Sequence, residues 1–449
     1  MKCLLSKIAA LLNCDIPADD LMVTGTAIDS RKVEAGSLFI ALSGEHVDGH
    51  HYLASARLAG ASAALVSVKQ DDELPQLVVG DVVLAFGQIA HYWRQQCVAK
   101  VIAITGSNGK TTVKEMVSTI LSQIGSVVAT QGNLNNELGV PLTLTRLSQD
   151  SDYAVIEMGA NHSGEIAPLV AMATPDVAMI NNVAAAHLEG FKSIEGVAKA
   201  KAEIFSGLSE QGVGVFNADM DFTDEWQQAL IGKNTKTFAL QNEADIKAEN
   251  MQVDPTASHF MVKLNNEFNY INLPLPGEHN VANALAAIAV TSALNVGVEA
   301  IEKGLALMTS VPHRLQLRKS VYQSQIIDDS YNANPGSYQR ALSVLTSFKG
   351  QHWLVLGDFA ELGGESLLIH GQMGEQAKEA GVERLWTVGE KSELATKTFG
   401  DGALHFKSLD ALETALKKAM SNDVVCLIKG SRFMKLDVLA DALALVGEQ

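Results

Sequence analysis

The sequence predicts an α/β protein of three domains, in which a small mixed α/β domain precedes two larger, mostly parallel sheets. The chain has 449 residues, too many for one hydrophobic core. Apolar runs typical of buried parallel strands alternate with amphipathic helical segments. Within residues 245–273 the pattern changes to a two-residue alternation, which predicts a small antiparallel patch on the central sheet.

The predicted domains span residues 1–83, 84–312 and 313–449. In the first, we expect helices at 3–12 and 53–60 and strands at 37–42 and 63–67. The segment Ser310–Arg314 has neither helix nor strand pattern and predicts a linker. The third domain repeats βα units and predicts a Rossmann-like sheet, with strands at 325–329, 352–357, 384–389 and 423–428 and helices at 337–347, 370–380, 409–420 and 434–446.

The composition restricts the classes of partner. The net charge of −17 disfavours nucleic acid and acidic membranes as general partners, although a nucleotide can bind in a local positive pocket. The four cysteines are scattered, which suits a reducing, cytoplasmic environment. No apolar run is long enough for membrane insertion, and Lys7 interrupts the apolar N-terminal stretch. Nothing in the sequence requires a protein partner, so we expect a monomer.

The segment 101–112 predicts a strand, a tight glycine loop and a helix. That arrangement directs backbone N–H groups and the positive end of a helix dipole at one point, where phosphate binds. A lysine there reaches phosphate oxygens, and the next hydroxyl can hold Mg²⁺. The longer phosphate-loop pattern requires a glycine where Ile104 stands, so this loop is a shortened form, and an ordinary glycine-rich turn is the alternative. The predicted phosphate-binding residues are Gly106, Ser107, Asn108, Gly109, Lys110, Thr111 and Thr112.

Polar residues that suit a metal ion follow other predicted strands of the central domain. Glu157 closes one strand, Asn181 and Asn182 close another, and His187 follows in the next loop. Ligands of open α/β sheets gather at strand carboxyl ends, so we expect Mg²⁺ there. The alternatives are a carboxylate paired with a lysine and a loop histidine with an ordinary hydrogen bond. Lys201 lies on a later helical segment, and its pattern also fits a solvated charged face.

Other candidate residues have an ordinary structural explanation beside a binding role. Ser30 and Arg31 in the first domain are candidate ligand contacts, as is a glycine-containing loop that consists of Asp48, Gly49 and His50. A surface arginine and a plain loop histidine are the alternatives. Asn280 and Asn283 can cap a helix or face a base or ribose. The third domain has no Gly-x-Gly-x-x-Gly, so a nicotinamide or flavin cofactor is not supported.

Together, these motifs resemble those of the Mur ligases of peptidoglycan synthesis. The resemblance covers the full length in the same order and rests on segments 105–111, 132–141, 277–283, 313–314 and 329–335. Segments 133–141, 329–335, 357–363 and 429–432 are most similar to the members that join D-alanyl-D-alanine to UDP-N-acetylmuramoyl-tripeptide. The phosphate loop alone is less specific, because folylpolyglutamate synthases share it.

The resemblance implies that ATP binds between the second and third domains. Thr111, Glu157 and His187 match metal positions for two Mg²⁺ ions, and Lys201 matches a carbamylated lysine. Arg314 would reach the phosphates when the domains close. Asn280 and Asn283 match adenine contacts, and Asp329 matches a ribose contact. The implied catalytic residues are Lys110, His187, Lys201 and Arg314.

The resemblance also implies where the other substrates bind. The first domain would hold the UDP-sugar, and Asn135 and Asn136 would lie near its peptide. The third domain would close on ATP and bind the incoming dipeptide through residues that include Asn332, Asn334, Lys429, Ser431 and Arg432. The implied reaction activates the tripeptide carboxylate as an acyl phosphate, which the dipeptide amine then attacks. The alternatives are another Mur-type or folylpolyglutamate-type ligase and, in a different class, a P-loop NTPase switch.

Overall fold

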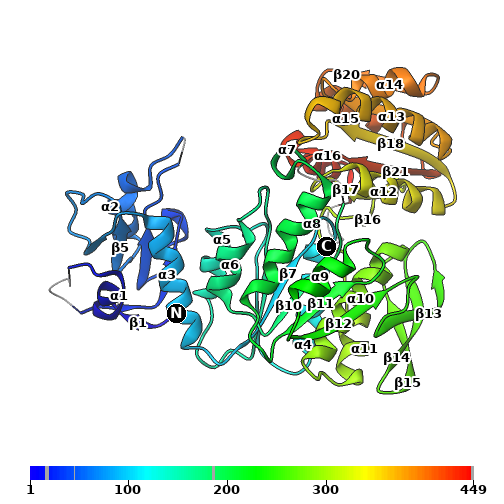
Figure 1. Ribbon diagram of the computed structural model, residues 1–449. Helices are drawn as coiled ribbons and strands as arrows, with labels where there is room; N and C mark the ends of the chain where they lie inside the picture. Colours follow the sequence, from blue (N-terminus) through cyan, green and yellow to red (C-terminus); the bar gives the residue numbers. More distant parts are fainter. Residues whose placement is uncertain (16–19, 45, 185–187, 446–449) are drawn as a thin grey trace.

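The computed structural model describes residues 1–15, 20–44, 46–184 and 188–445, and Figure 1 shows three domains along the chain. The first domain lies at one end, a nine-stranded sheet occupies the middle, and a six-stranded sheet forms the third domain. The predicted fold class is confirmed. Within the described ranges, no helix is long and apolar enough to cross a membrane.

The first domain is a small parallel sheet with short helices. Its four strands are β3 (Gly25–Ala27), β4 (Ser37–Ile40), β5 (Ala63–Val66) and β6 (Gln76–Val78). A separate antiparallel pair, β1 (Cys3–Leu4) and β2 (Met22–Val23), adjoins helix α1 (Leu5–Leu12). Helix α2 (Leu53–Leu58) contributes Leu53 and Ala56 to a cluster with Phe39 of β4.

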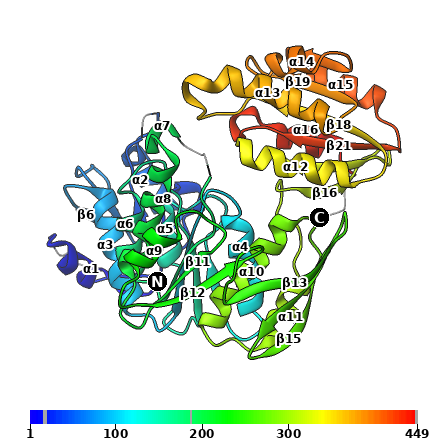
Figure 2. The same ribbon diagram turned by 45° about the vertical axis from the view of Figure 1, so that its right-hand side comes forward.

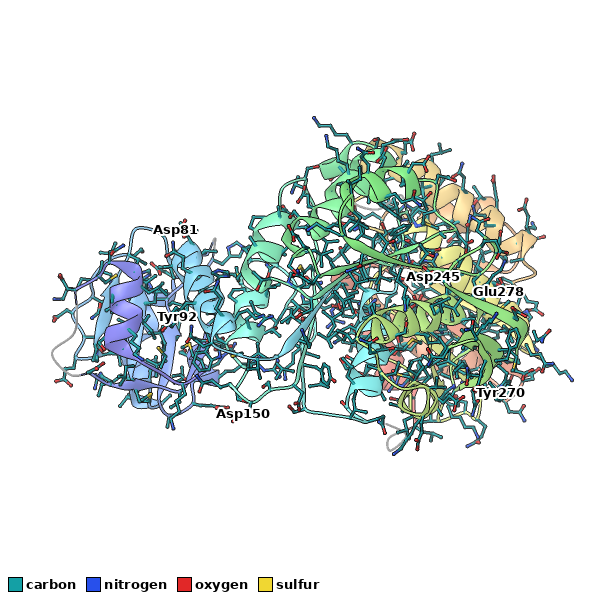
Figure 3. The ribbon with its side chains drawn as sticks, turned by 60° about the horizontal axis from the view of Figure 1, so that its bottom comes forward. Asp81, Tyr92, Asp150, Asp245, Tyr270 and Glu278 are labelled. Carbon is teal, nitrogen blue, oxygen red and sulfur yellow. The ribbon has the colours of Figure 1, made fainter. Side chains whose placement is uncertain are left out.

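Helix α3 (Val82–Gln95) joins the first two domains. It contacts α1 on one side and helices α5 and α6 on the other. Its Phe86, Ile89 and Trp93 are buried in a core that both domains share, and the indole Nε1 of Trp93 donates to the carbonyl of Leu147 at 2.8 Å. Asp81 caps the helix by accepting from the Leu84 N–H at 2.9 Å, and it lies at the opposite end of the molecule from Tyr270 (Figure 3). The predicted boundary between residues 83 and 84 thus falls in the first turn of α3.

The central sheet has the order β15-β14-β13-β12-β11-β10-β7-β9-β8. Strands β7 to β12 run parallel, and β13 to β15 form the predicted antiparallel patch. The strands are β7 (Lys100–Thr105), β8 (Val127–Ala129), β9 (Tyr153–Glu157), β10 (Val177–Ile180), β11 (Val213–Asn217), β12 (Asn234–Ala239), β13 (Ile246–Val253), β14 (Ser258–Leu264) and β15 (Glu267–Leu273).

Helices cover both faces of this sheet, because alternate residues of its strands point to opposite sides. Ile102 and Ile104 pack with α4 (Lys110–Leu121), α10 (Glu278–Ala293) and α11 (Val298–Ala306). Val101 and Ala103 pack in the core of the other face, whose helices are α5 (Gly139–Leu144), α6 (Ile166–Ala173), α7 (Leu188–Phe191), α8 (Ile194–Ala202) and α9 (Thr223–Ala229). This burial on both faces explains the continuous apolar runs in the sequence.

The third domain has the strand order β16-β17-β21-β18-β19-β20, and all neighbours except β16 and β17 are parallel. The strands are β16 (Gln316–Lys319), β17 (Gln325–Asp329), β18 (Gln351–Gly357), β19 (Arg384–Val388), β20 (Ala403–Phe406) and β21 (Val424–Lys429). The helices are α12 (Pro335–Ser347), α13 (Ser366–Glu379), α14 (Glu393–Phe399), α15 (Leu409–Ala419) and α16 (Leu436–Leu443). The sequence analysis did not predict β16, α14 or β20. Figure 2 shows this domain next to the central one, with α12 of the third domain on the side that faces α10 of the central domain.

Candidate functional site

A cleft of about 750 Å³ separates the central and third domains. It lies at the carboxyl ends of β7, β9 and β10 on one side and of β17 and β21 on the other. Sixteen of the predicted site residues line it, namely Ser107, Asn108, Gly109, Lys110, Thr111, Thr112, Asn135, Asn136, Glu157, Asn280, Asn283, Arg314, Asp329, Asn332, Asn334 and Lys429. These candidates, which are scattered along the chain, therefore lie together in one cleft at strand carboxyl ends.

The predicted phosphate loop, residues 106–112, is held in one shape by two asparagines from the end of β10. Asn182 Oδ1 accepts from the Asn108 N–H at 2.8 Å, and the side-chain amides of Asn181 and Asn182 donate to the Asn108 carbonyl at 2.9 and 3.0 Å. Gly109 has φ of 75°, and a Cβ there would lie 2.4 Å from Asn283 Oδ1. The position therefore requires glycine, both for conformation and for space.

Lys110 begins α4 and points its ammonium back over the loop. Its Nζ donates to the Gly106 carbonyl at 2.7 Å, and no carboxylate in the described part of the chain forms an ion pair with it. Burial lowers the pKa of Lys110, the Glu157 carboxylate opposes that shift, and Arg314 adds to it. The loop thus holds a desolvated cation that an anionic ligand would stabilise.

Glu157 and Thr111 form the oxygen-rich part of the cleft. The Thr111 hydroxyl donates to Glu157 Oε2 at 2.8 Å, and the Asn135 amide donates to Glu157 Oε1 at 2.8 Å. Glu157 is only 2% exposed, and no cation within the described residues forms an ion pair with it. A buried carboxylate beside a hydroxyl and an amide is the type of donor set that Mg²⁺ prefers, so these residues fit a metal.

Lys201 is buried on α8, with 4% of its surface exposed. Its ammonium makes no hydrogen bond or ion pair with another described residue. Burial holds the pKa of Lys201 well below its usual value, and the nearby Lys110 lowers it further. An amine in this setting tends toward the neutral form. His187, the other predicted metal ligand, lies outside the described residues.

The third-domain side of the cleft is built from paired charges. Lys429 is fully buried, and its ammonium lies 2.5 Å from Asp329 Oδ2 and donates to the Asn332 carbonyl at 3.2 Å. The other Asp329 oxygen accepts from the Leu315 N–H at 3.1 Å. The Arg314 guanidinium lies over the Tyr331 ring, 4.1 Å from its centroid. The residues on both sides of Arg314 are therefore fixed to the third domain.

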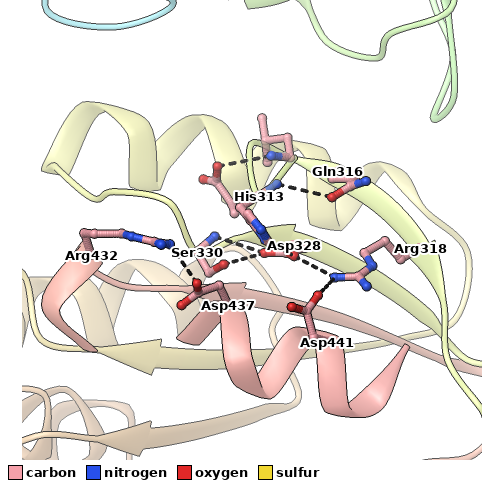
Figure 4. A network of polar contacts seen from close by, with 10 residues as sticks. His313, Gln316, Arg318, Asp328, Ser330, Arg432, Asp437 and Asp441 are labelled. Carbon is pink, nitrogen blue, oxygen red and sulfur yellow. Dashed lines mark hydrogen bonds and ion pairs between the residues drawn. The ribbon is translucent and has the colours of Figure 1, made fainter. Parts of the chain in front are cut away.

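A second cluster in this domain brings together the metal-binding types of side chain. Ligand atoms of His313, Asp328 and Asp441 lie within 4.8 Å of one another. Figure 4 shows why this is not a metal site: the Arg318 guanidinium donates to Asp328 at 3.1 Å and to Asp441 at 2.6 Å. His313 completes the network through its Nδ1, 2.9 Å from Asp328. The cluster is a charge network that holds the linker onto the sheet.

Asn280 and Asn283 lie within α10, whose N-cap is Gly277. The helix begins at Glu278. Asn283 Oδ1 accepts from the Asn181 amide at 2.9 Å, and the Asn280 amide donates to the Pro276 carbonyl at 2.7 Å. Neither residue is the N-cap, and both support the wall of the cleft.

The candidate residues of the first domain lie away from this cleft. Both ring nitrogens of His50 are engaged internally, since Nδ1 lies 2.6 Å from Asp48 Oδ1 and Nε2 accepts from the Ser67 N–H at 3.0 Å. Gly49 packs against the backbone of Leu42, where a Cβ would lie 2.7 Å from the nitrogen. These contacts shape the loop. Ser30 and Arg31 form a short 3-10 turn, and the exposed Arg31 is oriented by Asp29.

Three further candidates in the loops have structural contacts. Asn136 Oδ1 accepts from the Gly139 N–H at 3.1 Å and shapes the start of α5. The Ser431 hydroxyl accepts from the Ala360 N–H at 2.9 Å. Arg432 pairs with Asp437 at 2.8 Å (Figure 4). Neither Ser431 nor Arg432 lines the cleft as it stands.

Models of known families match most of the chain. The Mur ligase family catalytic-domain model matches residues 22–93, the Mur ligase middle-domain model matches 104–291, and the model of the Mur ligase glutamate ligase domain matches 313–432. The chain belongs to the Mur ligase family. The resemblance found in the sequence is thereby confirmed.

This Mur ligase is similar over nearly its full length to curated relatives. The UDP-N-acetylmuramoyl-tripeptide–D-alanyl-D-alanine ligase of Escherichia coli (strain K12) is 45% identical over 98% of both chains. The ligase of that name from Bacillus subtilis (strain 168) is 35% identical, over 95% of this chain and 94% of the relative.

Solved structures of Mur ligases also resemble this chain over nearly its full length. A crystal structure of MurF from Acinetobacter baumannii superposes with a TM-score of 0.90 at 35% identity and covers 98% of this chain and 99% of that one. The MurF ligase from Thermotoga maritima in complex with ADP has a TM-score of 0.83 at 26% identity, over 94% of this chain and 97% of that one.

The Mur ligase cleft also contains residues that the sequence analysis did not select. His279, Tyr331 and Arg340 all line it. Burial and, to a smaller extent, the charge of Arg340 lower the pKa of His279 to about 4, against the opposing effect of Asp329. The position of His279 inside the segment 277–283 was the available signal, whereas nothing local marks Arg340.

Proposed function

We propose that this Mur ligase joins D-alanyl-D-alanine to UDP-N-acetylmuramoyl-tripeptide with hydrolysis of ATP, giving the UDP-N-acetylmuramoyl-pentapeptide precursor of peptidoglycan, ADP and phosphate. The observation that carries the proposal is the pairing of a phosphate loop with a buried Glu157 and a third-domain arginine across one cleft. The names of the relatives that match over almost the whole chain support the choice of substrates.

We assign one task to each domain. Residues 1–83 bind the UDP-sugar, residues 84–312 bind ATP, and residues 313–449 close on ATP and bind the dipeptide. Arg31 is the most exposed candidate in the first domain and suits a diphosphate. The described cleft is formed by one chain, so we infer that a monomer is sufficient.

The first chemical step transfers a phosphoryl group. A carboxylate oxygen of the tripeptide attacks the γ-phosphorus of ATP, the bond to the β–γ bridging oxygen breaks, and ADP leaves. Lys110 and the backbone N–H groups of residues 109–111 orient the phosphates, and Arg314 approaches from the opposite side. These donors stabilise the negative charge of the transferring group.

The second step forms the amide. The neutral amine of D-alanyl-D-alanine attacks the carbonyl carbon of the acyl phosphate, the C–O bond breaks, and phosphate leaves together with the proton that the nitrogen gives up. Water would hydrolyse the acyl phosphate, so the cleft must be closed during the reaction. Asn332 and Lys429 stand at the third-domain side of the cleft, where the dipeptide would enter.

Thr111 and Glu157 would hold Mg²⁺, with His187 and a carbamylated Lys201 at a second site. Bound Mg²⁺ supplies neutralisation of the phosphate charge. Lys201 suits carbamylation, because a buried amine without an acceptor is disposed to be neutral and nucleophilic. Its Nζ would attack the carbon of CO₂ and release a proton, which replaces a repelled cation with an anionic oxygen donor.

The decisive experiment measures phosphate release from ATP with UDP-N-acetylmuramoyl-tripeptide, with and without D-alanyl-D-alanine. We expect turnover to require both and the pentapeptide to appear in equal amount. Turnover without the nucleotide-sugar would indicate a P-loop switch, and a requirement for a single amino acid or a folate would indicate another ligase of the family.

The carbamate is tested with Lys201→Ala. We expect activity to be lost and to return in part with a short carboxylate, which supplies the missing oxygens. Lys199→Ala is the matched control, since Lys199 is exposed on the same helix. An active Lys201→Ala enzyme would remove the carbamate from the proposal.

A further inference from the structure

Asn334 is held in one orientation by the helix that follows it. It is the N-cap of α12, and its Oδ1 accepts from the Ser337 N–H at 2.9 Å, while its own N–H donates to the Ser337 hydroxyl at 3.0 Å. A backbone N–H can only donate, so the atom that faces Ser337 is the amide oxygen. The Asn334 amide nitrogen must therefore point the other way.

That nitrogen crosses the cleft to the phosphate loop. Asn334 Nδ2 donates to Asn108 Oδ1 at 2.9 Å, which joins residues 226 positions apart. The main chain of Asn108 is fixed by Asn181 and Asn182. Because Asn334 can offer only a donor, Asn108 must present its oxygen, and the orientation of the Asn108 amide follows.

This orientation leaves one buried donor without an acceptor. Asn108 Nδ2 is shielded from solvent and forms no hydrogen bond with any residue that the structure describes. Buried amide N–H groups are nearly always bonded, so an acceptor is expected at this position. Asn108 lies in the turn that directs N–H groups and Lys110 into the cleft, and a phosphate oxygen is the acceptor that such a turn favours.

We propose that Asn334 is a positioning residue that turns the Asn108 amide so that its nitrogen donates to a nucleotide phosphate. The contact exists only while the third domain lies against the loop. Phosphate binding and domain closure therefore stabilise each other through this pair of asparagines. The proposal rests on the proposed use of ATP.

The linker couples Arg314 to the third domain, so Arg314 and Asn334 reach the phosphate loop in the same movement. The Tyr331 N–H donates to the His313 carbonyl at 3.1 Å, and the Leu315 N–H donates to Asp329 at 3.1 Å. Both residues next to Arg314 are thus bound to the third domain. One closing movement delivers the arginine and the asparagine amide to the phosphate loop.

The test is Asn334→Ser, measured on the full chain with ADP alone. Serine keeps the helix cap, but it is too short to reach Asn108. We expect ADP to bind about tenfold more weakly, as for loss of a hydrogen bond to a charged group. We also expect ADP to compact the unaltered chain in small-angle scattering and to compact Asn334→Ser less, and we expect the KM for ATP to rise while the KM for the dipeptide stays unchanged.

Asn334→Asp is the second variant, because it keeps both the cap and the reach but replaces the donor with an acceptor. We expect a larger loss of ADP affinity than with serine. Ser408→Ala is the matched control, since it removes the cap of α15 in the same domain. It should lower the melting temperature and leave ADP binding and compaction unchanged.

Two outcomes overturn the proposal and are distinguishable. If the unaltered chain fails to bind ADP, the proposed use of ATP fails with it. If the unaltered chain binds ADP and Asn334→Ser binds and compacts equally well, only the role of Asn334 is overturned.

Discussion

The two walls of the cleft treat their buried cations differently. On the central wall, Lys110 bonds only to a loop carbonyl, and Lys201 has no partner among the described residues. On the third-domain wall, Lys429 is paired with Asp329, and Arg314 lies on an aromatic ring. An unpaired buried cation is strongly unfavourable, whereas a paired one with additional hydrogen bonds recovers much of its desolvation cost.

This difference indicates that the two walls of the cleft have different roles. The central wall is poised for an anion, since a phosphate or carbamate would relieve the desolvation of its lysines. The third-domain wall is satisfied by itself and keeps its shape before closure. Binding energy from ATP is then realised mainly on the central side, and the other wall supplies a preformed surface.

The largest expected effect comes from Lys110→Met. We expect the rate of phosphate release to fall by about 10³-fold or more, because a cation aimed at the transferring phosphoryl group is lost. Stability should change little, because the lost hydrogen bond to the Gly106 carbonyl is offset by the removal of a desolvated cation that has no carboxylate partner in the described chain. Steady-state kinetics and thermal melting measure the two effects, and a variant that melts lower at unchanged activity would contradict these roles.

Lys429→Met should mainly lower the stability of the third domain, in contrast to Lys110→Met, which should mainly lower activity. Loss of the Lys429 ammonium leaves Asp329 buried without its cation, and breaking such a pair costs about 3–5 kcal/mol. We expect the unfolding transition of the third domain to move to markedly lower denaturant. The double variant Lys429→Met with Asp329→Leu should recover part of the loss, because no uncompensated charge then remains. Equal stability of the single and double variants would show that the loss does not come from the uncompensated charge of Asp329.

The two walls also differ in how far the sequence predicted them. The phosphate loop was predictable because Gly109, Lys110 and Thr111 are neighbours in the chain and the strand and helix patterns flank them. The pair of Lys429 and Asp329 joins residues 100 positions apart, so no local pattern reveals it. The alternation of apolar segments predicted the sheets, but the edge strand β16 has little burial and left no clear pattern.

The candidate residues in the first domain show a second reason why the sequence did not predict the whole site. His50 is a polar residue in a glycine-containing loop, which is the composition of a binding site. In the structure its ring is 7% exposed, with both nitrogens bonded within the domain. Composition therefore identified the loop, whereas the direction of the His50 ring depends on its contact with Ser67, which lies 17 positions further along the chain.

Lys114 lies one turn beyond Lys110 on the same helix, and its substitution should have a smaller effect. It is buried, and its ammonium donates to the Thr130 carbonyl at 2.7 Å and pairs with Glu115 at 2.6 Å. Lys114→Met leaves that carbonyl without its donor, which costs about 1–3 kcal/mol. The melting temperature should fall, while the rate of phosphate release should change much less than in Lys110→Met, because Lys114 does not line the cleft.

The smallest expected effect is a pH dependence of stability that differs between the cleft and the first domain. The folded chain holds the pKa of His279 near 4, below its ordinary value of 6.5. The unfolded chain therefore binds a proton first as the pH falls, and stability decreases between about pH 6.5 and pH 4. Asp29 of the first domain has its pKa lowered to about 2 by hydrogen bonds from Arg31, so its contribution is lost only below about pH 4.

The two windows can be separated by substitution. His279→Gln should flatten the stability curve between pH 6.5 and pH 4, whereas Asp29→Asn should alter it only at lower pH. Burial also lowers the pKa of His370 in the third domain, so part of the upper slope should persist in His279→Gln. Denaturant unfolding at closely spaced pH values measures both slopes. An unchanged upper slope in His279→Gln would mean that the cleft wall is solvated before closure, and the contrast between the two walls would then depend on the bound nucleotide.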